Sequence, residues 1–371
     1  MISVADHVRT WAEIDLDAIR HNIGVVRRRI GSQAEILAVV KADAYGHGVA
    51  PVARTLAAEA SIFGVANLKE ARDVAALGTG RDIMLLSACL PAERRDAVEE
   101  KFIVTVSGAD EAAAFADCGP ARINFKIDTG MGRIGCSADS ALEALRAVRQ
   151  MRNLEVHSIS THLPSADEDF VFTGSQLEKF AAMKNQIREI FPAAKNHALN
   201  SAGILNHHVG PTEIVRPGLM LYGASPILSM QKELRPALTW KARVAMVRDV
   251  AKGASISYGR TFIAPERMRV AVLALGYADG FPRHVSGNGS AALLHGNHCP
   301  ILGRVTMDQI VVDVSATPDV RPGDAATLVG NDGEQQITAT ELAARAGTIA
   351  WDIFTGIGQR VQRFHYDSAV N

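Results

Sequence analysis

The chain has 371 residues, of which 47% are hydrophobic and 21% charged, a composition that argues against disorder, a collagen and a coiled-coil rod. Its 39 basic and 40 acidic residues leave a net charge of -1, so the overall basic surplus typical of nucleic-acid binding is absent. A chain of this length predicts about two domains, or one large barrel and a smaller domain.

Targeting and membrane signals are not visible in the sequence. Residues 1–7 hold no basic stretch followed by an apolar one, so we expect no signal peptide. Apolar runs such as residues 270–275 are far shorter than the roughly 20 residues that cross a bilayer. The four cysteines, Cys89, Cys118, Cys136 and Cys299, form no Cys-x-x-Cys pair. We therefore expect a cytoplasmic protein without disulfides and without a membrane partner.

Short aliphatic runs alternate with amphipathic segments in the first part of the chain. An apolar stripe on residues 16–30 predicts a first helix, and stripes on residues 68–77 and 142–148 predict two later ones. Strands are expected at residues 35–41, 62–66, 82–87, 103–106, 122–128, 154–161, 195–199 and 213–216. Eight strand-helix units over roughly 200 residues predict a (β/α)8 TIM barrel, which we assign to residues 1–232.

The remaining residues, 233–371, have an all-β pattern. Strands are expected at residues 241–250, 268–275, 291–294, 309–314 and 325–329, separated by turns such as Asn288-Gly289 and Asp332-Gly333. One helix is indicated, because Thr338-x-x-Glu341 is a capping box and Gly347 marks a helix end. We therefore expect a mostly β C-terminal domain.

Reactive groups in a parallel barrel gather where the strands end. The strand at 35–41 delivers Lys41 directly after five aliphatic residues, where desolvation favours the neutral amine that can form a Schiff base. A lysine whose amine reaches solvent at the barrel rim is an equally good interpretation of this position taken alone.

Polar side chains also follow three later strands. A glycine-containing loop after residues 122–128 carries Arg133, which can bind a carboxylate or phenolate oxygen or can simply be a solvated loop arginine. His162 follows the strand at 154–161, and His197, Asn200 and Ser201 cluster after the next strand. Lone histidines are usually structural, but two at consecutive strand ends favour a site.

The last barrel strand leads into Arg216-Pro217-Gly218. Loops after the last two strands of a barrel often bind phosphate through small residues and backbone N–H groups, so Ser201 and Gly218 are candidates. A strand-end lysine, a phosphate site, an arginine and histidines together are what pyridoxal 5'-phosphate requires.

Seven motifs resemble those of alanine racemases, and they follow in order across nearly the whole chain. They are residues 11–16 (WAEIDL), 40–48 (VKADAYGHG), 126–133 (KIDTGMGR), 216–218 (RPG), 257–259 (SYG), 276–280 (GYADG) and 307–308 (MD). The resemblance implies a pyridoxal 5'-phosphate barrel followed by a β-domain, and a homodimer with shared active sites. It also implies interconversion of L-alanine and D-alanine, either to supply D-alanine for peptidoglycan or to consume it.

By this resemblance two residues exchange the α-proton. Lys41 would bind the cofactor and serve the D-alanine face, while Tyr258, supplied by the other subunit, would serve the L-alanine face with help from His162. Arg216 would face the pyridine nitrogen and leave it unprotonated, which weakens the cofactor as an electron sink and limits side reactions. His197 would support Arg216.

The resemblance assigns the remaining site residues as well. Arg133 and Met307 would bind the substrate carboxylate, Tyr277 would line the entrance, and Asp308 would lie beside the substrate. Lys126 would be carbamylated, with an ordinary lysine ion pair as the alternative. The cofactor contacts would be Lys41, Tyr45, Arg133, His162, His197, Asn200, Ser201, Arg216, Gly218 and Leu219.

Two positions depart from the family pattern. Gln359 stands where many members have a phosphate-binding tyrosine, which bears on cofactor affinity rather than on the chemistry. Thr306 stands where some members carry cysteine.

Other interpretations compete with this one. A fold-related pyridoxal-phosphate decarboxylase is disfavoured because Arg216 stands where an acidic residue is expected, and a barrel-only cofactor carrier would lack the β-domain. A racemase acting on serine or a broader range of amino acids stays open, since one extra atom discriminates by only about 1–3 kcal/mol. His295, His298 and Cys299 could bind a metal, with a polar loop as the favoured alternative. His207 and His208 are expected to be a surface pair at a helix end.

Overall fold

The computed structural model describes residues 7–206 and 213–367, and this part of the chain forms two compact units. The barrel unit comprises residues 19–44 and 49–235. The β unit comprises the residues up to 18, residues 45–48 and the residues from 236 onward. His207 and His208 lie outside the described residues.

Eight parallel strands form the core of the barrel unit. They are ordered β10-β2-β3-β4-β5-β6-β8-β9. Their bounds are β2 Glu35–Val39, β3 Ile62–Val65, β4 Asp82–Leu85, β5 Ile103–Val106, β6 Ala121–Asp128, β8 Leu154–Ser160, β9 Lys195–His197 and β10 Ile214–Val215. Backbone hydrogen bonds close the ring between β9 and β10, from the Arg216 N–H to the Leu199 carbonyl at 2.9 Å and from the Glu213 N–H to the Asn196 carbonyl at 3.2 Å. The predicted (β/α)8 barrel is confirmed, and each strand overlaps its predicted range.

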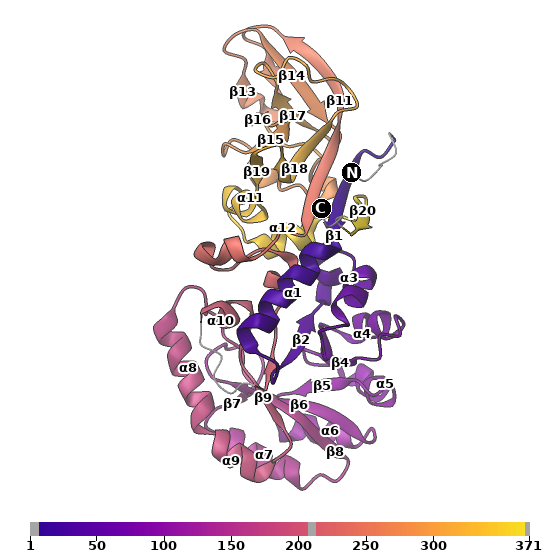
Figure 1. Cartoon of the computed structure of the whole chain (residues 1–371), viewed down its shortest axis with the longest axis vertical. Coiled ribbons are helices and arrows are strands. Elements are labelled where there is room, and N and C mark those ends of the chain that lie inside the picture. Colours follow the sequence, from indigo (N-terminus) through magenta and orange to yellow (C-terminus); the bar gives the residue numbers. More distant parts are fainter. Residues whose placement is uncertain (1–6, 207–212, 368–371) are drawn as a thin grey trace. The chain divides into compact units, whose positions relative to one another are not determined.

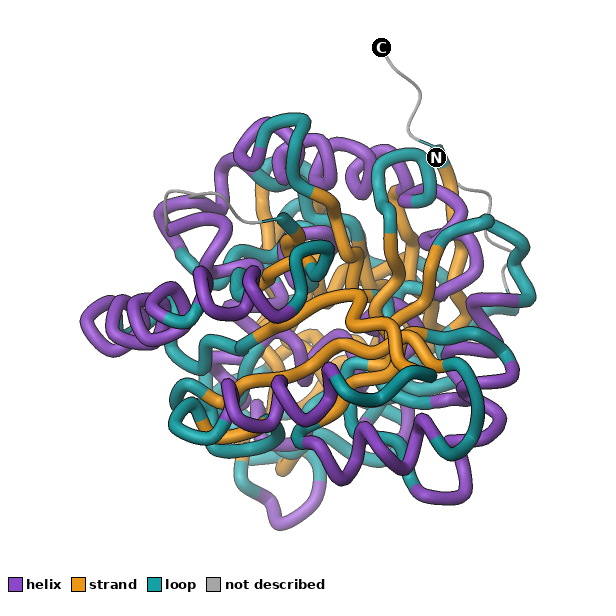
Figure 2. The backbone as a smooth tube through the Cα atoms, turned by 90° about the horizontal axis from the view of Figure 1, so that it is seen from below, coloured by secondary structure: helices purple, strands orange, loops and turns teal. Residues whose placement is uncertain are grey.

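Helices lie outside these strands (Figure 1), and in the view from below the strands run through the interior with helices around them (Figure 2). The helices are α1 Leu16–Ile30, α2 Lys41–Gly46, α3 Val49–Leu56, α4 Leu68–Ala75, α5 Arg94–Glu99, α6 Ala109–Ala116, α7 Ala141–Arg149, α8 Phe170–Ala182, α9 Lys184–Ile190 and α10 Ser201–Asn206. A two-residue strand, β7 (Cys136–Ser137), pairs with the end of β6.

The sequence pattern explains why these segments fold as they do. Every residue of β3 and β5 is buried, because both faces of a parallel barrel strand are covered. Helix α4 buries Leu68, Ala71 and Val74, which share one face at helical spacing. Asn67 begins that helix by accepting the Glu70 N–H at 3.0 Å on its side-chain oxygen.

The β unit is built on a closed ring of six antiparallel strands. Around the ring the order is β11-β14-β17-β16-β15-β18, and β18 pairs back with β11. The strands and helices of this unit from residue 238 onward are β11 Leu238–Val250, β12 Ser255–Ile256, β13 Phe262–Ile263, β14 Met268–Leu273, β15 Ala291–Leu294, β16 Asn297–Leu302, β17 Ile310–Asp313, β18 Ala325–Asp332, β19 Gln335–Ile337, α11 Ala339–Ala346, α12 Ala350–Gly356 and β20 Gln362–Tyr366. The expected all-β pattern is therefore confirmed, and β16 is a strand that the sequence analysis did not identify.

Two segments distant in sequence join the β unit. Strand β1 (Thr10–Asp15) pairs antiparallel with β11 and parallel with β20, which is why the first residues group with this unit. Residues 45–48 are held by the last strand, because Arg363 donates to the Gly46 carbonyl at 3.2 Å and a His365 ring nitrogen lies 2.7 Å from the His47 carbonyl.

The predicted C-terminal helix begins and ends where its capping residues indicate. The Thr338 hydroxyl accepts the Glu341 N–H at 3.0 Å, and Gly347 ends α11 with a left-handed conformation at φ 69°. In place of the reciprocal half of a capping box, the Glu341 carboxylate accepts from Arg345 at 3.0 Å.

Two further features of the described residues bear on the expectations above. None of their helices combines the length and the apolar character that crossing a membrane requires. The four cysteines carry free thiols.

Candidate active site

The carboxyl ends of the barrel strands bring the predicted site residues of this unit together. Lys41 follows β2, Lys126 lies near the end of β6, His162 follows β8, His197 ends β9, and Arg216 follows β10. Burial and then the positive charge of Arg216 lower the pKa of Lys126 to about 7. Burial, followed by the charges of Arg216 and Lys126, lowers the pKa of His162 as well. Residues widely separated in sequence therefore form one positively charged cluster.

Lys41 opens a left-handed helical turn. Ala42, Asp43, Ala44 and Tyr45 have φ between 51° and 54°, and Gly46 follows at φ 76°. Left-handed helical backbone costs roughly 1–2 kcal/mol per non-glycine residue, so four in succession require support from their surroundings. Such strain is concentrated at functional sites, and here it follows immediately after the candidate Schiff-base lysine.

Two carboxylates support this turn. Glu70 accepts the Ala42 N–H at 2.9 Å on one oxygen and the Ala66 N–H at 2.7 Å on the other, so it joins the ends of β2 and β3. Asp43 accepts the Val49 N–H at 2.7 Å. Charged acceptors thus satisfy the backbone N–H of Ala42, the first left-handed residue, and that of Val49, where α3 begins.

The environment of Lys41 favours its neutral amine. Burial lowers its pKa, and the positive charge of Arg133 lowers it further, while Glu70 acts in the opposite direction. A larger fraction of neutral amine increases the nucleophile available for Schiff-base formation. This environment supports the covalent role over the alternative of an amine in solvent.

Arg216 is buried and held by neutral acceptors. Its guanidinium donates to three backbone carbonyls, those of Thr161 at 2.6 Å, Ala198 at 2.9 Å and His197 at 3.0 Å. It also contacts the Nδ1 atoms of His197 and, at 3.5 Å, of His162. Burial lowers its pKa to about 10, so at neutral pH it keeps its proton and its charge.

Both histidines of the cluster are neutral. Burial and the charge of Arg216 lower the pKa of His162 to about 2 and hold that of His197 well below its usual range. A neutral imidazole has one donor and one acceptor nitrogen. Since Arg216 can only donate, the Nδ1 atom of His197 is the acceptor and Nε2 carries the proton.

The loop after β6 folds around one carboxylate. Asp128 accepts the N–H groups of Gly130, Met131 and Gly132 at 2.7–2.8 Å. Gly130 has φ 145°, and a Cβ there would lie 2.7 Å from the Phe172 ring. The loop leaves Arg133 exposed yet within electrostatic reach of Lys41.

The predicted phosphate residues contact one another after β9 and β10. The Ser201 hydroxyl oxygen accepts the N–H of Gly218 at 2.9 Å and of Met220 at 3.3 Å, so its own proton is left to donate. Leu219 begins the 3-10 turn Leu219–Tyr222, and Tyr222 donates to the Val39 carbonyl just before Lys41. The Asn200 side-chain amide instead connects two neighbouring segments, since it donates to the Leu163 carbonyl and accepts from the Gly203 N–H.

The barrel unit therefore offers groups that suit pyridoxal 5'-phosphate. Lys41 supplies an amine for the aldehyde, Arg216 a buried cation for a ring nitrogen, and Ser201 a hydroxyl proton for a phosphate oxygen. Tyr45, at the end of the left-handed turn, belongs to the β unit; it is buried, and burial raises the pKa of its phenol to about 12, so the phenol stays neutral.

In the β unit Tyr258 projects from a strained turn. It is 70% exposed and begins the 3-10 turn Tyr258–Arg260. Gly259 has φ 73°, and a Cβ there would lie 2.7 Å from the Arg304 guanidinium. Ser257, with φ 64°, donates from its hydroxyl to the Arg304 carbonyl. The turn holds the phenol out from the surface.

Tyr277 and Met307 are brought together in the same unit. The Tyr277 N–H donates to the Thr306 carbonyl and the Ala278 N–H to the Met307 carbonyl, each at 3.0 Å. Gly276 permits this approach, since a Cβ there would lie 2.2 Å from the Thr306 oxygen. Both side chains are exposed.

Asp308 is already engaged. It accepts from Arg360 at 2.7 Å, and Arg360 also pairs with the buried Asp279 at 3.1 Å. Gln359, which precedes Arg360 in the chain, is exposed. Asp308 therefore orients Arg360 in this structure, and its role beside the substrate stays a prediction.

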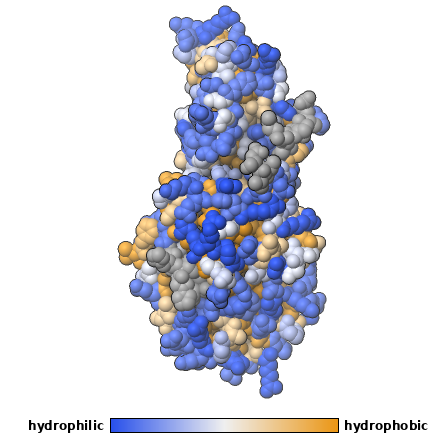
Figure 3. Space-filling model, viewed as in Figure 1, coloured by the Kyte–Doolittle hydropathy of each residue, from blue (hydrophilic) through white to orange (hydrophobic). Residues whose placement is uncertain are grey.

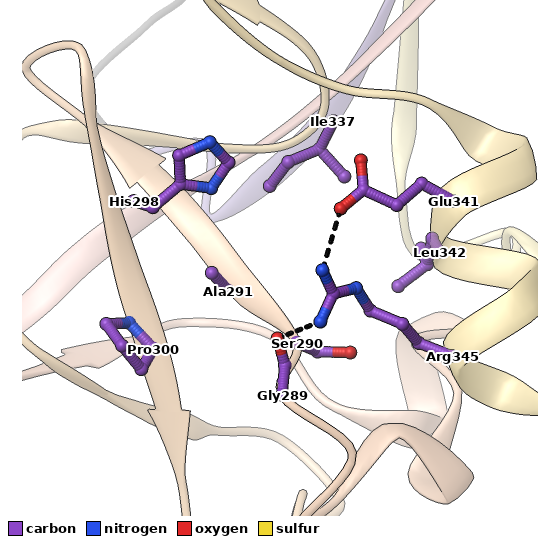
Figure 4. Close-up of a pocket in the computed structure, with 9 residues that line it drawn as sticks. All are labelled: Gly289, Ser290, Ala291, His298, Pro300, Ile337, Glu341, Leu342 and Arg345. Carbon is purple, nitrogen blue, oxygen red and sulfur yellow. Dashed lines mark hydrogen bonds and ion pairs between the residues drawn. The ribbon is translucent and has the colours of Figure 1, made fainter.

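The β unit also contains a pocket of about 260 Å³ that is lined by none of the residues predicted to bind cofactor or substrate, although His298 of the metal hypothesis lies in its wall. Figure 4 shows its charged groups already paired: Arg345, on α11, donates to the Glu341 carboxylate and to the Gly289 carbonyl. The pocket thus offers no unpaired charge to a ligand.

The three residues of the metal hypothesis point to different partners. His295 pairs with Asp324 at 3.1 Å, His298 contacts the Gln335 side-chain oxygen at 3.1 Å, and the buried Cys299 thiol lies 3.9 Å from the Thr317 hydroxyl. Among the described residues no group of three or more His, Cys, Asp or Glu is arranged to hold a metal ion.

Comparison with known proteins gives matches over both units. Residues 14–226 match the family described as alanine racemase, N-terminal domain, and residues 237–365 match alanine racemase, C-terminal domain. The chain belongs to the alanine racemase family. It is 40% identical over 367 residues to the alanine racemase of Halothermothrix orenii, covering 95% of this chain and 96% of that protein. The alanine racemase of Symbiobacterium thermophilum is 39% identical, covering 96% and 97%.

Solved structures of the family are similar over the whole chain. Alanine racemase from Streptomyces coelicolor A3(2) has a TM-score of 0.88 at 35% identity, covering 98% of this chain and 99% of that one. Alanine racemase from Bacillus anthracis with bound L-Ala-P has a TM-score of 0.89 at 33% identity, covering 99% and 97%. Since both family domains are present, the barrel-only interpretation is wrong.

Proposed function

We propose that the protein is a pyridoxal 5'-phosphate-dependent isomerase that interconverts L-alanine and D-alanine. The observation that carries the proposal is the cluster at the barrel end, where Lys41, an amine with a lowered pKa, and the buried Arg216, whose acceptors are all neutral, both act electrostatically on Lys126 and His162. The relatives named alanine racemase, similar over nearly their whole length, support the choice of alanine.

The cofactor, when bound through Lys41, would withdraw electrons from the α-carbon and make its hydrogen acidic. Arg216 cannot readily give up its proton, so a ring nitrogen facing it would receive a hydrogen bond rather than a proton. Racemisation needs only removal and return of one proton, and a weaker electron sink suffices for it. The same weakness disfavours decarboxylation.

Two bases are needed because the proton leaves one face of the α-carbon and returns to the other. We assign Lys41 as the base that removes the α-proton of D-alanine and Tyr258 as the base that removes the α-proton of L-alanine. Arg216 can only donate, so the Nδ1 atom of the neutral His162 accepts and its Nε2 atom carries the proton. That N–H would donate to the phenol oxygen of Tyr258 and stabilise the ionised form that acts as the base. Arg133 and the Met307 N–H would hold the substrate carboxylate, with Tyr277 at the entrance.

The experiment that tests this function uses purified protein and L-alanine in deuterated water. We expect D-alanine to form with deuterium at the α-carbon, and the protein to show the visible band of a Schiff base. If the protein shows the visible band but does not react with alanine, alanine is not its substrate. Serine, lysine and arginine would then be tested in the same assay. A colourless protein that takes up no added cofactor would overturn the cofactor as well.

We further propose that Lys126 carries a carbamate. Its side chain is only 8% exposed, and a pKa of about 7 leaves a large neutral fraction at physiological pH. A neutral amine can attack carbon dioxide and lose one proton, which turns a cation among cations into an anion that can orient Arg133.

The carbamate has a direct readout. Protein equilibrated with ¹³C-bicarbonate is expected to show a carbamate carbon signal by NMR that is absent from the Lys126→Ala variant. Lowering the pH below about 7 should weaken the signal, because the amine is then protonated and cannot react. A spectrum without this signal in the unsubstituted protein would refute the modification.

We also propose a cytoplasmic homodimer with shared active sites. Exposed apolar side chains occur on both units: Phe170 and Val171, at 54% and 86% exposure where α8 begins (Figure 3), and Tyr258 and Met307 in the β unit. Patches of this kind commonly mark interfaces. The free thiols suit a reducing compartment, where the enzyme would either supply D-alanine for peptidoglycan or consume it.

Mixing two inactive variants tests the shared site. Lys41→Ala and Tyr258→Phe are each expected to be inactive alone. If Tyr258 serves the partner's Lys41, a mixed dimer has one site with both lesions and one intact site, so activity should return to about one quarter of the wild-type value after subunit exchange. Absence of any recovery in verified mixed dimers, or a fully active monomer on dilution, would contradict the shared site.

A further inference from the structure

A chain of buried hydrogen bonds runs across the barrel interior and ends at His197. The Thr105 hydroxyl donates to the Leu85 carbonyl at 2.7 Å, and the Asn124 side-chain nitrogen donates to the Thr105 oxygen at 3.0 Å. The Asn124 side-chain oxygen accepts from the Ser158 hydroxyl at 3.1 Å and lies 3.1 Å from Nε2 of His197. Each of the four side chains is at most 2% exposed.

The direction of every bond in this chain follows from its first acceptor. A backbone carbonyl can only accept, so the single hydroxyl proton of Thr105 goes to Leu85 and its oxygen is left to accept. The Asn124 NH2 group must therefore face Thr105, and its oxygen must face His197. That oxygen can only accept, so Nε2 of His197 carries the proton and Nδ1 is free to accept from Arg216.

The strand register shows how these side chains come together. Thr105 pairs with Asn124 across β5 and β6, and Asn124 pairs with Ser158 across β6 and β8. The second pairing depends on a bulge, because the register moves from Ile123 opposite Val156 to Asn124 opposite Ser158 and leaves His157 out of the ladder. Bulges re-aim side chains, and they are rare between parallel strands. Without it, Asn124 would face His157 instead of Ser158.

We propose that Thr105 and Asn124 are positioning residues that fix the protonated nitrogen of His197, so that its Nδ1 atom accepts from Arg216 and holds the guanidinium in position toward the cofactor. The expected effect on catalysis rests on the proposed function. The direction of the hydrogen bonds follows from the structure alone. Neither residue contacts the cluster cations; both act through His197.

Loss of Thr105 predicts a specific failure. Without the hydroxyl, the Asn124 amide loses the partner that distinguishes its two ends and can turn its NH2 group toward His197. His197 would then protonate Nδ1, which would oppose an N–H of Arg216. Two donors facing each other in a buried site cost about 1–3 kcal/mol, so the arginine would shift or the histidine would populate both tautomers.

The test measures the tautomer of His197 directly, by ¹⁵N NMR of the histidine-labelled holoenzyme with the signal assigned through His197→Gln. Wild type should show a protonated Nε2 only. Thr105→Val, which keeps the shape of the side chain, should show a mixture of tautomers and a kcat/KM for L-alanine lower by about ten- to hundredfold. Thr105→Ser should restore both.

Ser158→Ala is the matched control. It removes a buried hydroxyl that lies 3.1 Å from Nε2 of His197 and can either donate or accept, so this hydroxyl sets no direction, and it leaves the Thr105 to Asn124 bond that does. It should keep a protonated Nε2. A Thr105→Val protein with the wild-type tautomer would overturn the proposal, as would an identical change in Ser158→Ala.

Asn124→Asp keeps the test decisive if Thr105→Val does not fold. A carboxylate has no N–H to turn toward His197, so Nε2 alone should stay protonated in Asn124→Asp, and also when Asn124→Asp is combined with Thr105→Ala. Thr105→Ala alone should show both tautomers. A protonated Nδ1 in the Asn124→Asp protein at neutral pH would refute the proposal. If wild type proves inert toward alanine while the tautomers change as described, the proposed function fails and the polarity argument stands.

Discussion

Replacing Lys41 with alanine is expected to remove the visible Schiff-base band and to lower racemisation by more than about 10⁴-fold, the upper range for one positioned base, because the residue also supplies the covalent attachment. The effect should be larger than that of any other single substitution in the barrel unit. Absorbance of the purified protein and the deuterium-exchange assay measure the two losses separately.

The control for this variant is Lys69→Ala. Lys69 is 84% exposed in its side chain and pairs only with Asp73 at the surface of α4, so the same truncation there should leave band and activity unchanged. A Lys41→Ala protein that keeps the band would mean that another amine binds the cofactor. Lys126, whose pKa is also lowered, would then be the first amine to replace.

The barrel and its strand-end residues could be predicted because their signals are local. Barrel strands are covered on both faces, so each appears in the sequence as a short aliphatic run, and the polar residue at its end stands out. Lys41, His162 and His197 were identified in this way, whereas the role of Arg216 came from the family resemblance. The C-terminal helix was equally visible, since Thr338 and Gly347 mark its two ends.

Other features depend on partners that no local pattern reveals. The left-handed turn contains Ala42, Asp43, Ala44 and Tyr45, none of them a glycine, and it is stabilised by Glu70 from the next strand-helix unit. Sequence propensity alone would have excluded that conformation.

Long-range pairing explains the remaining differences. Strand β1 joins the β unit only because β11 and β20, more than 200 residues later, provide its neighbours. Asn124 and Ser158 likewise meet only through a bulge at His157, and nothing in residues 154–161 indicates one. The sequence pattern located the cluster around Arg216, while the residues that orient His197 required the three-dimensional register.

The charges of the barrel end point to an anionic occupant. Lys41, Lys126 and Arg216 each have a pKa lowered first by burial, and for Lys126 the neighbouring cations act in the same direction. Bringing a phosphate and a carboxylate into this cluster would offset the mutual repulsion. Binding of the cofactor should therefore raise the pKa of Lys126, unless a carbamate already supplies the negative charge.

Tyr258→Phe is expected to keep the cofactor band but to slow loss of the α-hydrogen from L-alanine by about 10²–10⁴-fold, the usual contribution of a general base. The hydroxyl is the only group removed, and Tyr258 is 70% exposed on the β unit, so folding should be unaffected. Hydrogen loss from D-alanine should continue, because Lys41 serves that face. Tyr277→Phe, which removes a second exposed hydroxyl from the same unit, is the matched control and should affect both substrates alike.

The different effects of Tyr258→Phe on L-alanine and on D-alanine must be measured as α-hydrogen exchange with solvent rather than as net racemisation. The two enantiomers are mirror images of equal free energy, so kcat/KM for conversion must fall equally in both directions whichever base is lost. Exchange lacks this constraint, since each face can release its hydrogen to solvent and regain it without inversion. Equal loss of exchange from L-alanine and D-alanine would assign Tyr258 a structural role and leave the second base to be sought elsewhere.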